Sequence, residues 1–296
     1  MQDARIVIIT VYVDDLIIGG DALEDVEHVK ALLCKQFDTN DLDELRYFLG
    51  IEMIRNEGGI WLSQKKYGLD MLMKYGMADC KPILTPLDHN LKLRIDEGEV
   101  LDDATMYRRI VGSLIYMTIS RPDLSYAVRL VSQLIQLPRK PHLDAVRRIM
   151  RYVRATSDYA LFYDASTQVH VHGYTDSDWA GSVSDRRSTV GNMFSFGSAA
   201  VTWSGKKQPI VALLSTEVEY SGAVVAACEV AWPKMLLRDL EIQVQHPVVI
   251  YYDNISSIQL AQNLVFHACT KHIEVHYHFI RERVLDGNID LDYVGT

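Results

Sequence analysis

Apolar positions in the first part of the chain follow two different periods. The runs "RIVIITVY" and "LIIGG" are typical of strands, and they meet at the doublet Asp14-Asp15. From Glu24 to Phe37 the apolar residues recur at helical spacing, which predicts an amphipathic helix. The segment "LRYFLGIEMIRNEGGIWLSQ" predicts a second hairpin that turns between Asn56 and Gly59. The N-terminal part is therefore expected to mix strands with helices.

The middle of the chain predicts helices joined by a long loop. A short helix is expected around "YGLDMLMKYG", and "DCKPILTPLDHNLKLRIDEGEV" shows turn residues without a clear period. Three helices should follow, at "YRRIVGSLIYMTI", "DLSYAVRLVSQLI" and "HLDAVRRIMRYVRAT". The second and third open with Pro122 and Pro141, and proline is favoured in the first turn of a helix.

After Thr156 the pattern changes to short strands followed by alternating helices and strands. The runs "VHVHGYTD", "VGNMFSFG" and "AAVTWSG" predict three strands, and "STEVEYSGAVVAACEVAWPKML" predicts one long helix. Next come a strand "PVVIYYDN", a helix from Ser256, a helix "KHIEVHYHFIRERVL" and a last strand "NIDLDYVG". This order indicates a mixed sheet with helices on its faces. We place the boundary before it near Tyr163.

Composition limits the classes of protein that fit. The chain has 296 residues, 48% of them hydrophobic, and no apolar run is long enough to span a bilayer. Its start lacks the basic segment and cleavage pattern of a signal peptide, and its four cysteines show no C-x-x-C pairing. We therefore expect a cytoplasmic or nuclear location, not a secreted or membrane protein; the oligomeric state stays open.

A local basic stripe stands out against the formal net charge of −9. The segment from Arg139 to Arg154 holds six Lys or Arg residues against one Asp. Arg147, Arg151 and Arg154 fall on one helical face, which makes them candidates for contacts with a nucleic-acid backbone. The alternative is a solvated helix face.

Two further motifs each have two interpretations. Lys206 and Lys207 in "WSGKKQ" are candidate phosphate contacts, or a solvated turn. The segment "FHACTKHIEVHYH" resembles zinc-ligand spacing, although part of it also belongs to the predicted helix "KHIEVHYHFIRERVL"; its candidate ligands are His267, Cys269, His272, His276 and His278.

Three acids occupy suggestive places in the last part of the chain. Asp176 ends the first predicted strand, Glu219 lies in the first turns of the long helix, and Asp253 ends the fourth strand. If those two strands are neighbours, the carboxylates converge, and such a cluster needs a cation that prefers hard oxygen ligands. Each acid alone also fits an ordinary turn, a solvated helix position or a helix cap.

In this order the motifs resemble a known family. "GYTDSDWAG", "STEVEY", "YYDN" and "TKHIEVHYHFIRE" resemble the ribonuclease H domain of copia-type retrotransposon Pol polyproteins. "YVDDLIIGG", "YFLGIEM", "LSQKKYGLDMLMKYGM", "GSLIYMTISRPDL" and "HLDAVRRIMRYV" resemble the C-terminal part of the same family's reverse transcriptase. The resemblance implies an α/β fold with the end of a palm at 1–80, thumb or connection helices at 81–163 and a ribonuclease H-like, mixed five-stranded sheet flanked by helices at 164–296.

The resemblance also implies chemistry for the acids. In "YVDD", Asp14 would be a metal-binding acid of RNA-directed DNA synthesis and Asp15 its partner. Asp176, Glu219 and Asp253 would hold Mg²⁺, with Mn²⁺ as a substitute, for two-metal hydrolysis of the RNA strand of an RNA–DNA hybrid. Without the resemblance, the Asp14-Asp15 doublet would be interpreted as a plain hairpin turn. The alternative function is a non-catalytic relic that binds nucleic acid or a partner chain.

The chain also departs from the family pattern. A palm acid well upstream of "YVDD" is expected, but thirteen residues precede Asp14, so we expect no polymerase activity from this chain alone. The sequence stops at "NIDLDYVGT", so a fourth ribonuclease acid is expected to be missing. Smaller departures stand at Asp43, Leu214 and His276.

Overall fold

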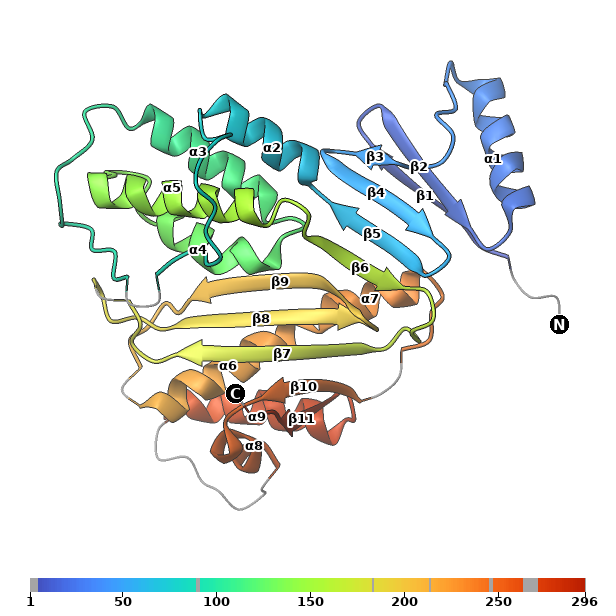
Figure 1. The fold of residues 1–296 in the computed structure, drawn as a ribbon. Helices are drawn as coiled ribbons and strands as arrows, with labels where there is room; N and C mark the ends of the chain where they lie inside the picture. Colours follow the sequence, from blue (N-terminus) through green and yellow to red (C-terminus); the bar gives the residue numbers. More distant parts are fainter. Residues whose placement is uncertain are drawn as a thin grey trace. The chain divides into compact units, whose positions relative to one another are not determined.

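The computed structural model of the chain describes residues 5–88, 91–182, 184–212, 214–244, 247–262 and 271–295 (Figure 1). These residues form two compact units, 1–49 and 50–296. Both units mix helices with strands, so the predicted α/β class is confirmed. The expected functional division into 1–80, 81–163 and 164–296 uses other boundaries and stays a prediction.

The first unit contains the predicted N-terminal hairpin and helix. Strands β1 (Val7–Tyr12) and β2 (Asp15–Gly20) pair antiparallel, and they are followed by helix α1 (Leu23–Gln36) and short strand β3 (Tyr47–Phe48). In α1, all of which is described, no side chain is fully buried, and Val26, Val29 and Leu33 are half-buried. These three belong to the face that the apolar period predicts.

The second unit begins with a small sheet and a layer of helices. Strands β4 (Ile51–Asn56), β5 (Gly59–Ser63) and β6 (Ala160–Asp164) pair antiparallel in that order. The helices are α2 (Lys65–Lys74), α3 (Thr105–Met117), α4 (Pro122–Ser132) and α5 (Lys140–Ala155). The predicted hairpin, short helix, long loop and three helices are all confirmed.

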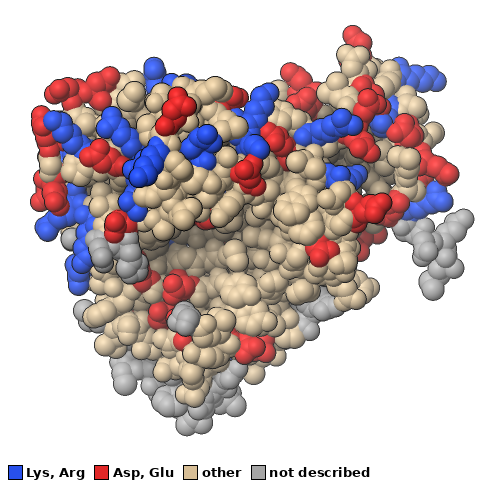
Figure 2. Space-filling view, in the orientation of Figure 1, with Lys and Arg blue, Asp and Glu red and all other residues tan. Residues whose placement is uncertain are grey.

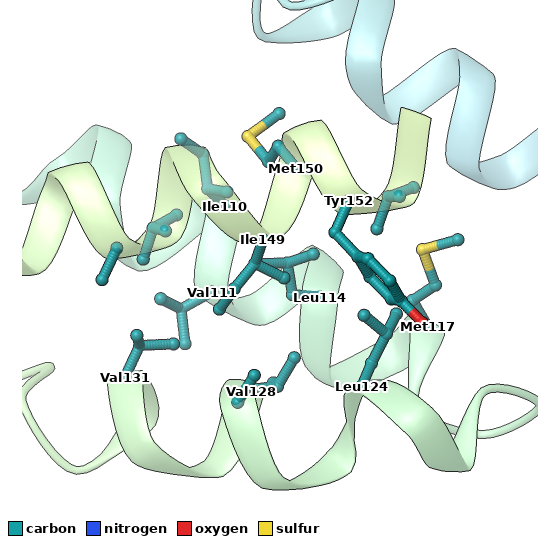
Figure 3. Close-up of a cluster of buried hydrophobic side chains, with 14 of the residues drawn as sticks. Ile110, Val111, Leu114, Met117, Leu124, Val128, Val131, Ile149, Met150 and Tyr152 are labelled. Atoms are coloured by element: carbon teal, nitrogen blue, oxygen red, sulfur yellow. The ribbon is translucent and has the colours of Figure 1, made fainter. Parts of the chain in front are cut away.

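A hydrophobic core joins these helices (Figure 3). Leu114 of α3, Val128 of α4 and Ile149 of α5 point into it, and each is at most 2% exposed. Tyr107 is also buried, and its hydroxyl donates a 2.7 Å hydrogen bond to the Val131 carbonyl. Because interiors are close-packed, this layer is a rigid support for what attaches to it.

The rest of the second unit is a mixed five-stranded sheet, as predicted, and its strands lie in the order β11-β10-β7-β8-β9. Its strands are β7 (Val171–Asp178), β8 (Thr189–Phe196), β9 (Ala199–Lys207), β10 (Val248–Tyr252) and β11 (Ile289–Tyr293). Its helices are α6 (Ser215–Glu229), α7 (Ala231–Asp239), α8 (Ile255–Gln262) and α9 (Lys271–Leu285). In Figure 1, α6 crosses behind β7 and β8, whereas α4 packs beside β9.

Two elements differ from the sequence analysis. No strand is expected at Ala160–Asp164, yet β6 pairs there with β5, and the boundary placed near Tyr163 falls inside this strand. The prediction of a single long helix is wrong, because α6 and α7 are separate helices that meet at Val230. Pro233 explains the break, since it has no N–H to donate to the carbonyl of Glu229.

Side chains of β7 alternate between two faces of the sheet. Thr175 and Ser177 are buried, whereas Asp176 and Tyr174 are exposed. Helix α6 approaches the buried face very closely at Gly222, because a Cβ there would lie 2.3 Å from Ser177 Oγ. A glycine at this position therefore sets how near α6 comes to β7.

Leu114→Ala should lower the free energy of unfolding by about 2–5 kcal/mol, since Leu114 is fully buried and its truncation leaves a cavity. Ile115→Ala, at the next position of α3, should cost about 0.5 kcal/mol or less, since Ile115 is 47% exposed. Urea unfolding followed by circular dichroism measures both. Equal losses would contradict the burial that distinguishes the two positions.

Gly222→Ala should destabilise the chain by about 1–3 kcal/mol, because the new methyl group collides with Ser177 Oγ. Gly112→Ala is the matched control in α3: a Cβ there meets no atom within 4 Å, so it should be neutral or stabilising by about 0.5–1 kcal/mol. Adding Ser177→Ala to Gly222→Ala removes the colliding hydroxyl and should restore part of the loss in thermal unfolding. No rescue would argue against this close approach.

Candidate metal centre

Asp176 and Asp253 come from neighbouring parallel strands. Asp176 lies near the C-terminal end of β7, and Asp253 directly follows β10. Tyr251 pairs with Tyr174, so the same register continued by two residues places Asp253 opposite Asp176. The strands of a parallel pair run in the same direction, so residues that continue the register stay side by side. Strand pairing is therefore what brings these two carboxylates to one edge.

Glu219 reaches the same edge from helix α6. It lies one turn before Gly222, so the close approach of α6 to β7 carries its side chain towards the strand ends. Its Oε2 atom is buried and has no hydrogen-bond partner in the described part of the chain. A buried carboxylate oxygen without a partner is costly, and a cation bound beside it would remove this cost.

The three acids converge. Asp176, Glu219 and Asp253 each offer one carboxylate oxygen, and these atoms lie within 4.8 Å of one another. Carboxylate oxygens are the ligands that Mg²⁺ and other hard divalent cations prefer. The donor set and the unpartnered Oε2 of Glu219 both fit such an ion. The convergence that the sequence predicts is therefore present in the geometry.

Burial and charge act together on Glu219. Burial raises the pKa of Glu219 to about 7, and the negative charges of Asp253, Asp176 and Asp178 add to the shift. Near pH 7 the side chain is therefore balanced between its protonated and ionised forms. A divalent cation would favour the ionised form, since opposite charge lowers the pKa of a carboxyl.

Two residues that shape this centre are not among those predicted from the sequence. Asp178 adds negative charge to it, and one of its oxygens accepts the Thr189 N–H. Strand alternation could have identified Asp178, because it lies two residues beyond Asp176 on the same face. Gly222 could have been suspected from its helical spacing to Glu219, but only the structure shows what it approaches.

Asp14 and Asp15 lie at the tip of the β1–β2 hairpin, where both are exposed. The turn residue Val13 has φ of 51°, a conformation that a β-branched residue rarely adopts. Among the described residues, neither acid belongs to a group of three metal-ligating side chains. The hairpin is therefore confirmed, and the catalytic role of this doublet stays a prediction.

The arginines of the predicted basic stripe make contacts within the chain. Arg151 Nε donates to the Lys81 carbonyl at 2.7 Å, and Arg154 Nε donates to the Ala78 carbonyl at 3.0 Å. Arg147 pairs weakly with Asp144 at 3.5 Å. The stripe thus fastens the long loop to α5, an interaction that the charge pattern did not predict. Its contact with nucleic acid stays a prediction.

Lys206 and Lys207 lie at the end of β9, and both are paired. Lys206 bonds Glu229, and Lys207 contacts Ser182 at 2.9 Å and Asp185 at 2.8 Å. The side chain of Lys206 keeps 60% exposure. These pairings do not test whether the two lysines contact phosphates, so that role stays a prediction.

Two other expectations concern metals and membranes. His267 and Cys269 of the zinc-like segment lie outside the described residues, as do the side chains of His272 and His276. Among the helices that are described, none has the length and hydropathy needed to cross a bilayer.

Comparisons with known proteins find a family model that matches the N-terminal part of the chain and relatives that match nearly all of it. The family model described as reverse transcriptase (RNA-dependent DNA polymerase) matches residues 1–89. The chain is 41% identical over 291 residues to the retrovirus-related Pol polyprotein from transposon RE2 of Arabidopsis thaliana, a match covering 98% of this chain and 20% of the polyprotein. The chain thus spans about a fifth of that relative's length.

A shorter relative is covered more fully. The putative transposon Ty5-1 protein YCL074W of Saccharomyces cerevisiae is 33% identical over 226 residues, which cover 75% of this chain and 73% of that protein. A solved foamy viral protease-reverse transcriptase, in complex with an RNA/DNA hybrid, is 13% identical with a TM-score of 0.50, covering 97% of this chain and 36% of that chain. The sequence similarities show that the chain belongs to the family of retrovirus-related Pol polyproteins of copia-type transposons.

Proposed function

We propose that this chain is the part of a copia-type Pol polyprotein that hydrolyses the RNA strand of RNA–DNA hybrids. The observation that carries the proposal is the convergence of Asp176, Glu219 and Asp253, with a buried oxygen of Glu219 left without a partner. Residues 164–296 would form the ribonuclease H-like part, 81–163 its connecting helices and 1–80 the end of the polymerase palm. Membership of a family of Pol polyproteins supports this division.

Mg²⁺ is the cation that this centre would hold, with Mn²⁺ as a substitute. Asp176, Glu219 and Asp253 would be the ligands, because their oxygens are hard donors at one edge of the sheet. When bound, such ions activate a water and stabilise the leaving oxygen of a phosphodiester. The chain's own contribution is to keep three negative side chains in place through strand pairing and the packing of α6.

The nucleic acid would be held through its backbone. Arg147, Arg151 and Arg154 on α5, with Lys206 and Lys207 on β9, are the proposed contacts. Arg151 and Arg154 each use Nε for a loop carbonyl, which fixes the guanidinium groups in place. Backbone contacts of this kind are independent of sequence and weaken with salt. The RNA/DNA hybrid in the solved foamy viral structure supports this class of ligand.

Purified chain should cleave labelled RNA within an RNA–DNA hybrid in Mg²⁺, and Asp253→Asn should reduce the rate more than about 100-fold. The substitution keeps the shape but removes a ligand charge, and even outer partners of a metal site are worth about 10- to 100-fold. Gel analysis of the labelled RNA measures this. The matched control is Asp239→Asn, an exposed acid with 66% side-chain exposure.

Each outcome of this assay has a meaning. Cleavage that Asp253→Asn abolishes and Asp239→Asn spares supports the proposal. Hybrid that is bound but never cut would favour the alternative of a non-catalytic nucleic-acid-binding protein. Cleavage that both variants retain would show that the acids at the sheet edge are not responsible.

Without divalent cations, the thermal stability of the chain should fall as pH rises from about 4.5 to 7. The folded-state pKa of Glu219 is about 7, above the usual value of 4.5 for a glutamate, so the folded chain binds more protons than the unfolded chain in this window. Stability is therefore lost as Glu219 ionises, on the order of a few degrees in Tm. Adding Mg²⁺ above pH 7 should raise Tm, since the cation binds the ionised form.

Glu219→Gln should remove most of this pH dependence and most of the Mg²⁺ effect. Glu217→Gln, in the first turn of the same helix, is the matched control and should leave both unchanged. Scanning fluorimetry at several pH values with and without Mg²⁺ measures both. A Tm of the Glu219→Gln variant that still falls over the same window would assign the titration to another group.

A further inference from the structure

Arg129 of α4 carries a guanidinium group whose hydrogen-bonding needs are unmet. Its Nε and Nη1 atoms are buried, and neither has a hydrogen-bond partner in the described part of the chain. Nor does any ion pair within 4 Å join it to a described carboxylate. Buried N–H donors of a cation without acceptors are costly, and an acceptor bound beside them would remove this cost.

The surroundings hold the guanidinium in one place. Its Nε lies against the backbone of β9, because a Cβ at Gly205 would be 2.9 Å away from it. The Tyr126 ring lies 5.9 Å from its Cζ atom, and Asp178 attracts its charge from β7. Gly205 therefore leaves the room that Arg129 occupies.

A strip without side chains separates Arg129 from the acids. Asp176 of β7 pairs with Gly191 of β8, and Gly191 pairs with Gly205 of β9, so all three share one face of the sheet. A Cβ at Gly191 would meet the Asp176 carbonyl oxygen at 3.9 Å, an ordinary contact, so the space above this position is not filled by a neighbouring side chain. Neighbouring strands are about 4.8 Å apart, and Gly205 is two strands away from Asp176, so these two residues are about 10 Å apart across the sheet. Arg129 lies against Gly205.

The surface of the second unit is hollowed between its helices and its sheet. Figure 2 shows this recess, with acidic atoms along its lower edge. The glycine strip, defined as Gly191 and Gly205, gives the Asp176 face of the sheet a stretch of bare backbone. Such a stretch lets an extended polar chain lie close to the sheet.

We propose that the glycine strip seats the phosphate backbone of a nucleic-acid strand and that Arg129 contacts one of its phosphates. This inference rests on the proposed hydrolysis, since it places the cleaved phosphate at the acids. About 10 Å corresponds to two or three nucleotide steps at about 3.4 Å of rise each. Arg129 would then be a positioning residue that fixes the register of the strand on the metal centre.

A purely structural role for Arg129 makes different predictions. If its purpose is to hold α4 to the sheet through attraction to Asp178, removing it should change unfolding but not the response to individual phosphates. If Arg129 instead contacts a phosphate, neutralising that one phosphate should weaken binding by the wild type but not by a variant that lacks Arg129. An experiment that combines a substitution of Arg129 with the neutralisation of one substrate phosphate therefore distinguishes the two roles.

The experiment scans a defined RNA–DNA hybrid in which one phosphate at a time is a neutral methylphosphonate. Binding is measured in Ca²⁺, and cleavage in Mg²⁺, for the wild type, Arg129→Gln and Arg129→Lys. Arg109→Gln on α3, whose side chain is exposed, is the matched control. Thermal unfolding of each variant verifies that it is folded.

We expect one phosphate, within about three nucleotides of the cleaved bond, whose neutralisation weakens wild-type binding about 10- to 100-fold. The same neutralisation should have no effect on Arg129→Gln, whereas Arg109→Gln should respond like the wild type. The slope of log affinity against log salt should fall by about 0.7–0.9 in Arg129→Gln, which is the loss of one phosphate contact. Arg129→Lys should keep the slope but lose part of the affinity, because its ammonium lacks the planar fork.

Other outcomes overturn the inference. Identical methylphosphonate profiles for the wild type and Arg129→Gln would assign Arg129 a structural role only, and cleavage would leave the proposed hydrolysis standing. Binding without cleavage would overturn the hydrolysis alone, because the scan in Ca²⁺ still locates the phosphate. A wild-type chain that binds no hybrid would overturn both.

Discussion

Three carboxylates at one edge of a sheet repel one another, and the second unit is built so that they cannot separate. Asp176 and Asp253 are fixed by the parallel pairing of β7 with β10, which positions backbone rather than flexible side chains. Glu219 is fixed by helix α6, whose Gly222 lies against β7. The repulsion is therefore opposed by strand register and helix packing, interactions that involve far more atoms than the acids do.

The sheet is itself fastened to the helical layer at several points. Trp203 of β9 donates a 2.9 Å hydrogen bond to the Thr118 carbonyl after α3. Tyr163 of β6 donates a 3.0 Å hydrogen bond to the Ala200 carbonyl of β9. Because the helices share a close-packed core, these contacts give the sheet a rigid neighbour. A nucleic-acid strand on this face would therefore meet groups from both layers in a fixed arrangement.

Local pattern was enough to predict most elements and the three acids of the centre. Alternation identified β7 and β10, and the acids at their ends follow from that assignment. The local sequence pattern could not predict interactions between residues that are far apart in the sequence. Strand β6 is short and forms by pairing with β5, about a hundred positions earlier in the sequence. Likewise, the charge of Arg154 is visible in the sequence, but its bond to the Ala78 carbonyl is not.

Two of the buried polar groups that the described part of the fold leaves unsatisfied have opposite charges, and they belong to helices α6 and α4. Glu219 presents a buried oxygen without a donor, which a cation would satisfy, and Arg129 presents buried N–H groups without an acceptor, which an anion would satisfy. In the sheet, β8 lies between β7, which carries Asp176, and β9, against which Arg129 packs. A divalent cation together with a phosphodiester backbone supplies both charges at that spacing. The strip itself carries no side chain, so a phosphodiester backbone bound there would meet only protein backbone between the acids and Arg129.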